Sequence, residues 1–438
     1  MRLKRYGCAR RPSQAVGALF LTCGVLLAAE SITVDRVQQR YPWNGLVDID
    51  YTIAGVEGDP NDYQIEFTMT VDGKSFVASN FWDAAWCDHA TANGRQRATW
   101  NARADGIAAL AEVGVAAKLV YAPCTDADAT FAIIDLSAGP RSTGYPVRYV
   151  NADTNRTAQF NIDAYKTRKL VLKKVHAGEF WMGEGNVTNG TSRHRVRLTK
   201  DYFLGLFEVT QQQYIQVRGE LGSYCTDSFS KDSYGQRASC RPVGRLLWTT
   251  AMEAGTGFID RLSRLSTVRG GSTGGFDLPT EAQWEYACRA GCGSKYYYGE
   301  DMTNNLPYYA NYNMQIAFDG NGNYSPESGK LDAALIHTDE VGRRIPNAWG
   351  FYDLAGNVSE WCRDWNTPYP AYSETEVTED PAGSEVGTQK ILRGGSYFHG
   401  PGYCASGHRD NAGPSDTGGH YGGFLPNGWG MRVILNLK

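Results

Sequence analysis

Short stretches in the first third of the chain alternate hydrophobic and polar residues with a period of two, which predicts half-buried β-strands. Asp72-Gly73 separates two of them and predicts a tight hairpin turn. Several short strands within about 100 residues predict a β-sandwich of the immunoglobulin-like type over residues 30–138. The expected strands are residues 47–53, 63–71, 74–77, 116–121 and 130–136.

After a turn-rich segment that we interpret as a linker over residues 139–166, a second region extends from residue 167 to residue 438. Helical patterns are few in it. The clearest begins after Thr280, with Gln283 three positions later as in a capping box, and ends at Gly291. Two more helices are expected, one after Thr210 and one over residues 250–265.

The N-terminus has the pattern of a secretory signal over residues 1–29. A basic head is followed by an apolar run over residues 15–27 and by Ala28-Ala29. The run is short for a membrane span, and an uncleaved anchor is the alternative. No later stretch is apolar enough to span a bilayer. We therefore expect a soluble, exported protein that is secreted, periplasmic or held at the cell surface.

Composition narrows the class of protein. Of 438 residues, 42% are hydrophobic and 21% are charged, which is enough for a large core and argues against global disorder. The net charge of −4 argues against a nucleic-acid partner. The 50 glycines lack a collagen period and indicate much irregular backbone.

Cysteine usage agrees with export. Of the ten cysteines, Cys8 and Cys23 fall in the predicted signal, and an even number remains. In an exported protein these are first interpreted as disulfides. The local pairs Cys87–Cys124 and Cys225–Cys240 are the ones we expect. No paired Cys-x-x-Cys pattern typical of zinc sites is present.

Six ordered motifs in the second region resemble the sulfatase-modifying factor family, typified by formylglycine-generating enzyme. The resemblance covers residues 167–438. It implies an α+β fold related to C-type lectins, with low regular secondary structure. The motifs are residues 177–183, 202–210, 278–287, 347–361, 392–397 and 430–433.

The typical family member oxidises a substrate cysteine with O₂, using Cu(I) held by two thiolates. Soft Cu(I) prefers such sulfur ligands. Aligned from the left of the Gly394-Gly395-Ser396 motif, His399 occupies the first thiolate position and Cys404 the second; aligned from the right, Cys404 matches neither. Ser396, His399 and Cys404 are therefore the catalytic candidates. The alternatives are a mixed His399–Cys404 copper site and a disulfide-bonded Cys404.

Relatives with sulfoxide-synthase activity hold iron with three histidines, and His399, His408 and His420 are the only candidates close in sequence. The resemblance also implies structural calcium. One site maps onto Asp353, the carbonyls of Gly356 and Val358, and Glu360. The second begins at Asn311 and the Tyr312 carbonyl.

Two functions follow. The first is a non-catalytic or divergent family member that lacks the two-thiolate copper site and binds a protein or a glycan. The second is a copper-dependent oxidoreductase that converts a sulfatase cysteine to formylglycine. Tyr296-Tyr297-Tyr298 would line a peptide or sugar groove in the first case, with core packing as the alternative.

Overall fold

The structure is a computed structural model of the chain, and it divides into two compact units, residues 1–124 and 125–438. The residues that it describes are 30–57, 59–108, 112–184, 192–221, 238–267, 275–300, 306–312, 316–318, 324–326, 337–369, 375–416 and 428–437. The predicted signal and Cys225 lie outside them. No helix in these ranges is long and apolar enough to cross a membrane.

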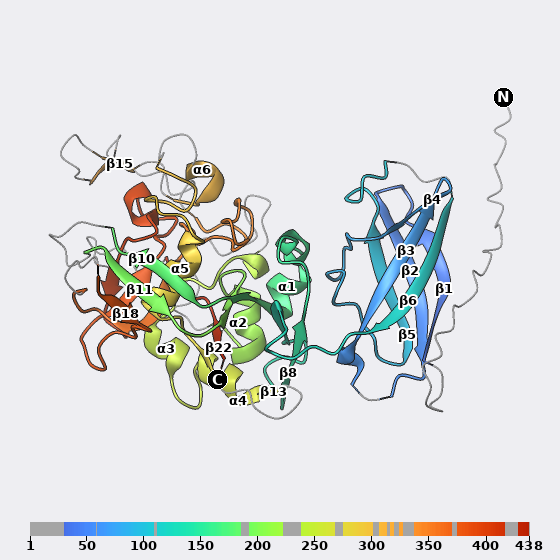
Figure 1. Cartoon of the computed structure of the whole chain (residues 1–438), viewed down its shortest axis with the longest axis horizontal. Helices are drawn as coiled ribbons and strands as arrows, with labels where there is room; N and C mark the ends of the chain where they lie inside the picture. Colours follow the sequence, from blue (N-terminus) through green and yellow to red (C-terminus); the bar gives the residue numbers. More distant parts are fainter. Residues whose placement is uncertain are drawn as a thin grey trace. The chain divides into compact units, whose positions relative to one another are not determined.

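The first unit consists of two three-stranded antiparallel sheets, ordered β1-β2-β5 and β4-β3-β6 (Figure 1). The strands expected before residue 125 are confirmed, and Asp72 and Gly73 turn with positive φ between β3 and β4. Whether the unit is immunoglobulin-like stays a prediction. The strands are β1 (Ser31–Gln39), β2 (Leu46–Ala54), β3 (Tyr63–Val71), β4 (Lys74–Val77), β5 (Gly94–Asn101) and β6 (Val113–Tyr121).

One hydrophobic core joins the two sheets. Alternate residues of β2 and β3 point into it, among them Tyr51 and Phe67, whose rings meet edge to face at 5.5 Å. Trp100 of β5 is fully buried beside them and donates its indole N–H to Asp105 at 2.7 Å. The period-two pattern therefore sets which face of each strand is buried.

The expected boundary between the two regions was wrong. The strand expected at residues 130–136 exists as β7 (Phe131–Asp135), but it pairs with β9 in the second unit. Four successive β7 residues, from Phe131 to Ile134, are buried, as in a central strand covered on both faces. The expected linker also folds with the second unit, where it forms β8 (Tyr145–Val150) and α1 (Ala164–Thr167).

The second unit is mostly β-sheet with short helices. Its largest sheet has seven strands in the order β13-β8-β7-β9-β12-β22-β14, and smaller sheets have the orders β10-β11-β18, β20-β19-β17-β21 and β15-β16. Figure 1 labels β10, β11 and β18 of one of the smaller sheets. The strands not yet bounded are β9 (Lys169–Val175), β10 (Gly178–Met182), β11 (His194–Leu198), β12 (Tyr202–Gly205), β13 (Ser266–Thr267), β14 (Phe276–Asp277), β15 (Ile316–Phe318), β16 (Tyr324–Pro326), β17 (Ser359–Trp365), β18 (Val377–Glu379), β19 (Lys390–Arg393), β20 (Asp410–Ala412), β21 (Trp429–Gly430) and β22 (Ile434–Asn436).

Capping boxes place two of the helices as expected. Thr210 caps α2 (Gln211–Arg218) and Thr280 caps α5 (Glu281–Arg289), each with a Gln at the third helical position. The remaining helices are α3 (Trp248–Met252), α4 (Phe258–Leu265), α6 (Leu306–Tyr309) and the short 3₁₀ turns, of which η6 (Pro401–Cys404) concerns the site.

The single helix expected over residues 250–265 is in fact two. α3 ends at Met252, and Gly255 takes φ +84° before α4 begins. A Cβ at Gly257 would lie 2.5 Å from the Glu253 nitrogen, so the chain turns back on itself there. The helical spacing of apolar residues continues from α3 into α4. The sequence pattern therefore did not predict the break between the two helices.

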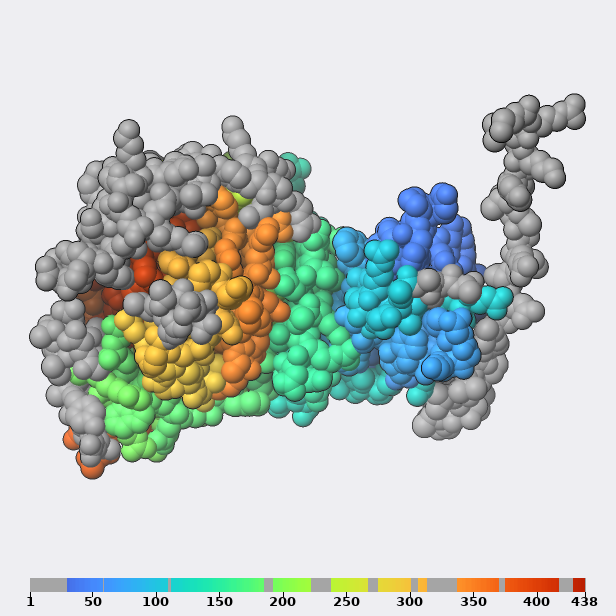
Figure 2. Space-filling model, turned by 90° about the horizontal axis from the view of Figure 1, so that it is seen from above, coloured from blue at the N-terminus to red at the C-terminus, as the bar shows by residue number. Residues whose placement is uncertain are grey.

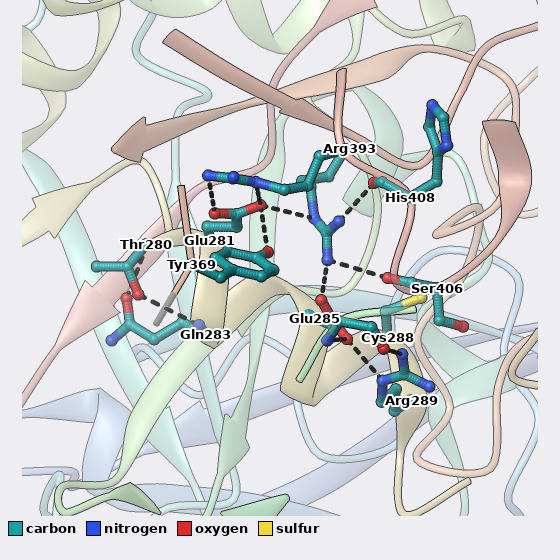
Figure 3. A network of polar contacts seen from close by, with 12 residues as sticks. Thr280, Glu281, Gln283, Glu285, Cys288, Arg289, Tyr369, Arg393, Ser406 and His408 are labelled. Atoms are coloured by element: carbon teal, nitrogen blue, oxygen red, sulfur yellow. Dashed lines mark hydrogen bonds and ion pairs between the residues drawn. The ribbon is translucent and has the colours of Figure 1, made fainter. Parts of the chain in front are cut away.

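Buried ion pairs hold α5 between the β10-β11-β18 sheet and the sheet of β17 and β19 (Figure 1). Glu285 accepts from Arg289 Nε at 2.7 Å and also pairs with Arg393, and both Glu285 and Arg393 are essentially unexposed (Figure 3). Burial alone would raise the pKa of Glu285, but Arg393 and Arg289 hold it below its usual value. Glu285 is therefore a charged carboxylate in the core.

A second pair lies beside α5. Arg432 donates to Glu360 from Nη2 at 2.7 Å and from Nε at 3.0 and 3.1 Å, and Trp284 of α5 donates its indole N–H to the same carboxylate at 2.7 Å. None of these three side chains is exposed. Removing one partner would leave a buried charge without compensation.

We predict that Arg432→Met lowers the free energy of unfolding by about 3–5 kcal/mol, because Glu360 would stay buried without its guanidinium. Urea unfolding followed by circular dichroism measures the change. Arg363→Met is the matched control: Arg363 is 56% exposed and lies 3.5 Å from Asp277. It should cost less than about 1 kcal/mol. Equal losses for the two variants would contradict the prediction.

Candidate functional site

The candidate site is built on a turn that follows β19. Gly394 and Gly395 both have positive φ, +90° and +69°, which favours glycine. A Cβ at Gly395 would lie 2.8 Å from the Tyr403 carbonyl group, so the turn also packs tightly against η6. This geometry brings residues 396–404 back over the end of the sheet and places Ser396 opposite His399.

His399 is held by two neighbours. Its Nδ1 lies 3.0 Å from Ser396 Oγ, and its ring stacks on Tyr403 with centroids 4.5 Å apart and planes 6° apart. Burial lowers the pKa of His399, so the imidazole is neutral at pH 7. The sequence placed His399 and Ser396 in one site, and the structure does bring them together.

Cys404 ends η6, is only 1% exposed, and forms no disulfide. Burial, with Cys288 nearby, raises the pKa of Cys404, which keeps the thiol protonated at neutral pH. Cys288 on α5 is also an unbonded buried thiol, and burial raises its pKa to about 12. The disulfide alternative for Cys404 does not hold in this structure.

Tyrosines from the segment after α5 stand beside η6. Tyr296 donates to the Pro401 carbonyl at 3.3 Å and stacks on Tyr298 at 5.2 Å, and Tyr298 stacks in turn on Tyr309 at 4.6 Å. Tyr296 and Tyr297 are buried. These rings pack on one another, so the packing interpretation of this triplet is the one that fits. In Figure 2 the segment that follows α5 (yellow) adjoins residues 337–369 (orange) on the surface of this unit.

The residues present do not fit the family's copper site. Cu(I) there needs two thiolates, and this turn offers one protonated thiol and an imidazole whose Nδ1 contacts a hydroxyl. Within the described ranges, no three side chains of His, Cys, Asp or Glu are grouped so that they could hold a metal ion. The alignment from the left, which pairs His399 with Cys404, therefore yields no two-sulfur centre.

Only two histidines of the expected iron triad, His399 and His408, are among the described residues, so the triad stays a prediction. The Tyr403 ring contacts both imidazoles, with centroids 4.5 Å from His399 and 4.4 Å from His408. Burial, with Arg393 and His399 nearby, lowers the pKa of His408 to about 3. His420 lies outside the described residues.

The first calcium site expected from the sequence does not fit a cation at Glu360. Both oxygens of Glu360 already accept from Arg432, and one also accepts from Trp284. Asp353, with φ +58°, accepts from the Gly342 N–H at 2.6 Å, and burial raises its pKa to about 6. Gly356 N–H donates to the Gly394 carbonyl and Val358 N–H to Glu208, while the Gly356 and Val358 carbonyls stay predicted ligands.

The second expected calcium site stays a prediction, because no contact of the described residues occupies the Asn311 side-chain oxygen or the Tyr312 carbonyl expected as its ligands. Asn311 Nδ2 donates to the His337 carbonyl at 2.9 Å, and the Asn311 carbonyl accepts from Asn357 N–H at 2.7 Å. Tyr312 is partly buried, with its pKa raised by burial. The later ligands of this site fall in residues 317–321, of whose side chains the structure describes none.

Sequence reasoning missed Glu208 as a partner of this region. Its carboxylate accepts from Val358 N–H at 3.0 Å and from Asn357 Nδ2 at 2.6 Å, while burial and the nearby Asp353 raise its pKa. The signal was present, because Glu208 lies inside the matched motif 202–210. Only the tertiary fold shows that it faces the turn at Asn357.

The two expected local disulfides are not established. Cys87 is buried and Cys124 is partly exposed, and their pairing stays a prediction. Cys225 lies outside the described residues, so its pairing with Cys240 is untested. Cys288, Cys292, Cys362 and Cys404 are unbonded thiols.

Comparison with known proteins places these features in a family. The sequence profile of the sulfatase-modifying factor enzyme 1-like domain matches residues 159–424. Formylglycine-generating enzyme of Streptomyces coelicolor is 38% identical over 128 residues, and serine/threonine-protein kinase pkn1 of Chlamydia pneumoniae is 28% identical over 260 residues. These matches take in 29% and 55% of this chain. The chain spans 38% and 35% of the two relatives' lengths.

Two solved structures are similar to this chain, each with a TM-score below 0.5. Treponema denticola variable protein 1 matches with a TM-score of 0.45 and 26% identity, covering 61% of this chain and 96% of that one. PvdO from Pseudomonas aeruginosa matches with a TM-score of 0.44 and 23% identity, covering 61% and 94%.

We predict that iodoacetamide at pH 7.5 leaves Cys404 unmodified in the folded protein and modifies it after denaturation. The reason is that the nucleophile is the thiolate, and burial keeps this thiol protonated. Peptide mapping by mass spectrometry gives the extent of labelling at each position. Cys292, partly exposed, is the internal comparison and should react first. Rapid native labelling of Cys404 would show that it is an accessible thiolate.

We also predict that excess EGTA leaves the melting temperature of the protein unchanged, because Arg432 and Trp284 already satisfy Glu360. Differential scanning calorimetry with and without added CaCl₂ measures this. A melting temperature that falls with EGTA and recovers with calcium would contradict the prediction and show that calcium binds, at Glu360 or at the second expected site.

Proposed function

Because the chain belongs to the sulfatase-modifying factor family, we propose that it is an exported, non-catalytic or divergent member that binds a protein or a glycan. Export is proposed from the basic head and apolar run of residues 1–29. We propose in addition that the second unit has the family's C-type-lectin-related fold and that the first is immunoglobulin-like.

The observation that carries the proposal is the side chain at the first thiolate position. In the alignment from the left His399 takes this position, and its Nδ1 contacts Ser396 and its ring stacks on Tyr403. The one nearby sulfur, Cys404, is a buried thiol whose pKa is raised. This pair lacks the two soft anionic ligands that Cu(I) requires, which supports loss of the oxidation chemistry while the scaffold is kept.

The second candidate function is the copper-dependent oxidoreductase that converts a sulfatase cysteine to formylglycine. It is favoured by Ser396 and Cys404 within the matched motif and by similarity to formylglycine-generating enzymes. A bound Cu(I) would there supply O₂ activation, and this chain would have to bind the ion through Cys404 and His399. The geometry of the turn supports the non-catalytic function better.

We predict that the wild-type protein neither retains Cu(I) nor converts a Cys-x-Pro-x-Arg peptide, and that His399→Cys gains Cu(I) binding because it supplies the second sulfur ligand. Copper retained after gel filtration and the peptide mass report the two properties separately.

His399→Ser is the matched control, since it removes the imidazole without adding a thiolate; it should bind no copper. Formylglycine formed by the wild-type protein would overturn the non-catalytic function. Failure of His399→Cys to bind copper while folded would show that the turn itself, and not residue 399 alone, excludes the metal.

A further inference from the structure

The outer face of the β1-β2-β5 sheet carries a ladder of charged and hydroxyl side chains. Arg97 of β5 pairs with Asp50 of β2 at 2.6 Å, and Arg40, just after β1, pairs with Asp48 at 2.8 Å. The carboxylates are 14% and 18% exposed, whereas the two arginines are 53% and 39% exposed. The guanidinium groups are therefore fixed from below by carboxylates and still reach solvent.

Trp82 lies at the edge of this face. The preceding residue, Phe81, forms an antiparallel bridge with Trp100, and both of these side chains are buried in the core. Trp82 donates its backbone N–H to the Thr99 carbonyl at 2.8 Å, so it continues the pairing by one residue. Because successive side chains alternate between faces, the indole of Trp82 is on the outer face, where it is 57% exposed.

Polar groups converge beside this indole. Thr99, the cross-strand neighbour of Trp82, donates its hydroxyl to Asp48 at 3.0 Å and accepts from Arg40 Nη2 at 3.4 Å. Asp83 accepts from the Thr99 N–H at 3.0 Å. Tyr41, which follows Arg40 directly, is 98% exposed. An exposed indole thus adjoins donors and acceptors that their mutual hydrogen bonds hold in place.

We propose that this face of the first unit, centred on Trp82, Arg40 and Asp48, is a binding site for neutral glycans. A pyranose ring is amphipathic: its C–H face stacks on an indole, and its hydroxyl rim needs paired donors and acceptors such as a guanidinium and a carboxylate. The proposal concerns the first unit and does not depend on the function of residue 399.

The balance of charges on this face favours a neutral sugar over a charged ligand. Charged side chains around the face include four aspartates, Asp35, Asp48, Asp50 and Asp83, and four arginines, Arg36, Arg40, Arg95 and Arg97. A balanced surface gives no net attraction to nucleic acid, an acidic polysaccharide or an anionic membrane. A hydrophobic peptide would need an apolar groove, whereas here one indole is flanked by ionic groups. A neutral sugar matches both properties.

The test is isothermal titration of the full-length protein with cellohexaose, chitohexaose, xylohexaose and mannohexaose, with hexagalacturonate as the acidic comparator. We expect one or more of the neutral oligosaccharides to bind. Trp82→Ala should weaken that binding at least about tenfold, while Trp82→Phe keeps part of it because it retains an aromatic face. Arg40→Gln should weaken binding with Trp82 intact.

Tyr121→Ala is the matched control, because Tyr121 is an aromatic residue that is 62% exposed on β6 of the other sheet; it should bind as the wild type does. Circular dichroism melting confirms that each variant is folded. The proposal is overturned if no neutral oligosaccharide binds, if Trp82→Ala binds as tightly as the wild type, or if only hexagalacturonate binds.

Discussion

The second unit depends on the buried pair of Glu285 and Arg393. A charge in the core is tolerated only when it is paired and its remaining hydrogen-bonding groups are satisfied. Glu285 also accepts the Gly183 N–H at 2.8 Å, and Arg393 also donates to the carbonyls of Ser406 and His408 (Figure 3). One ion pair therefore ties α5, the end of β10 and the segment after Cys404 to β19.

This arrangement explains how a site built from loops keeps its shape. The backbone around residues 394–408 is fixed by Arg393 from within and by the two glycines of the turn, and none of these contacts uses the side chains of His399 or Cys404. His399 is accommodated there by local contacts with Ser396 and Tyr403. The backbone of the turn is thus held independently of the two candidate side chains.

What the sequence predicted well is local. The β3–β4 hairpin follows from Asp72-Gly73, the capping box of α5 follows from Thr280 and Gln283, and the start of α2 follows from Thr210. What it missed depends on distant partners. The β7 strand looked like part of the sandwich because nothing local shows that it pairs with β9, and the pairing of Glu360 with Arg432, 72 positions away, was not expected. Buried charge compensation has no periodic signature in the sequence.

The degree of burial distinguishes the turn after β19 from the outer face of the β1-β2-β5 sheet. At the turn, and on the neighbouring strand β17, polar side chains are engaged in internal contacts: His399 with Ser396, and Glu360 with Arg432. On the first unit, the charged ladder is paired internally as well, but its arginines keep solvent-facing area next to the exposed indole of Trp82. Polar groups that are paired and buried cannot bind a ligand. Polar groups that are paired but half exposed are held in position and can still contact a ligand.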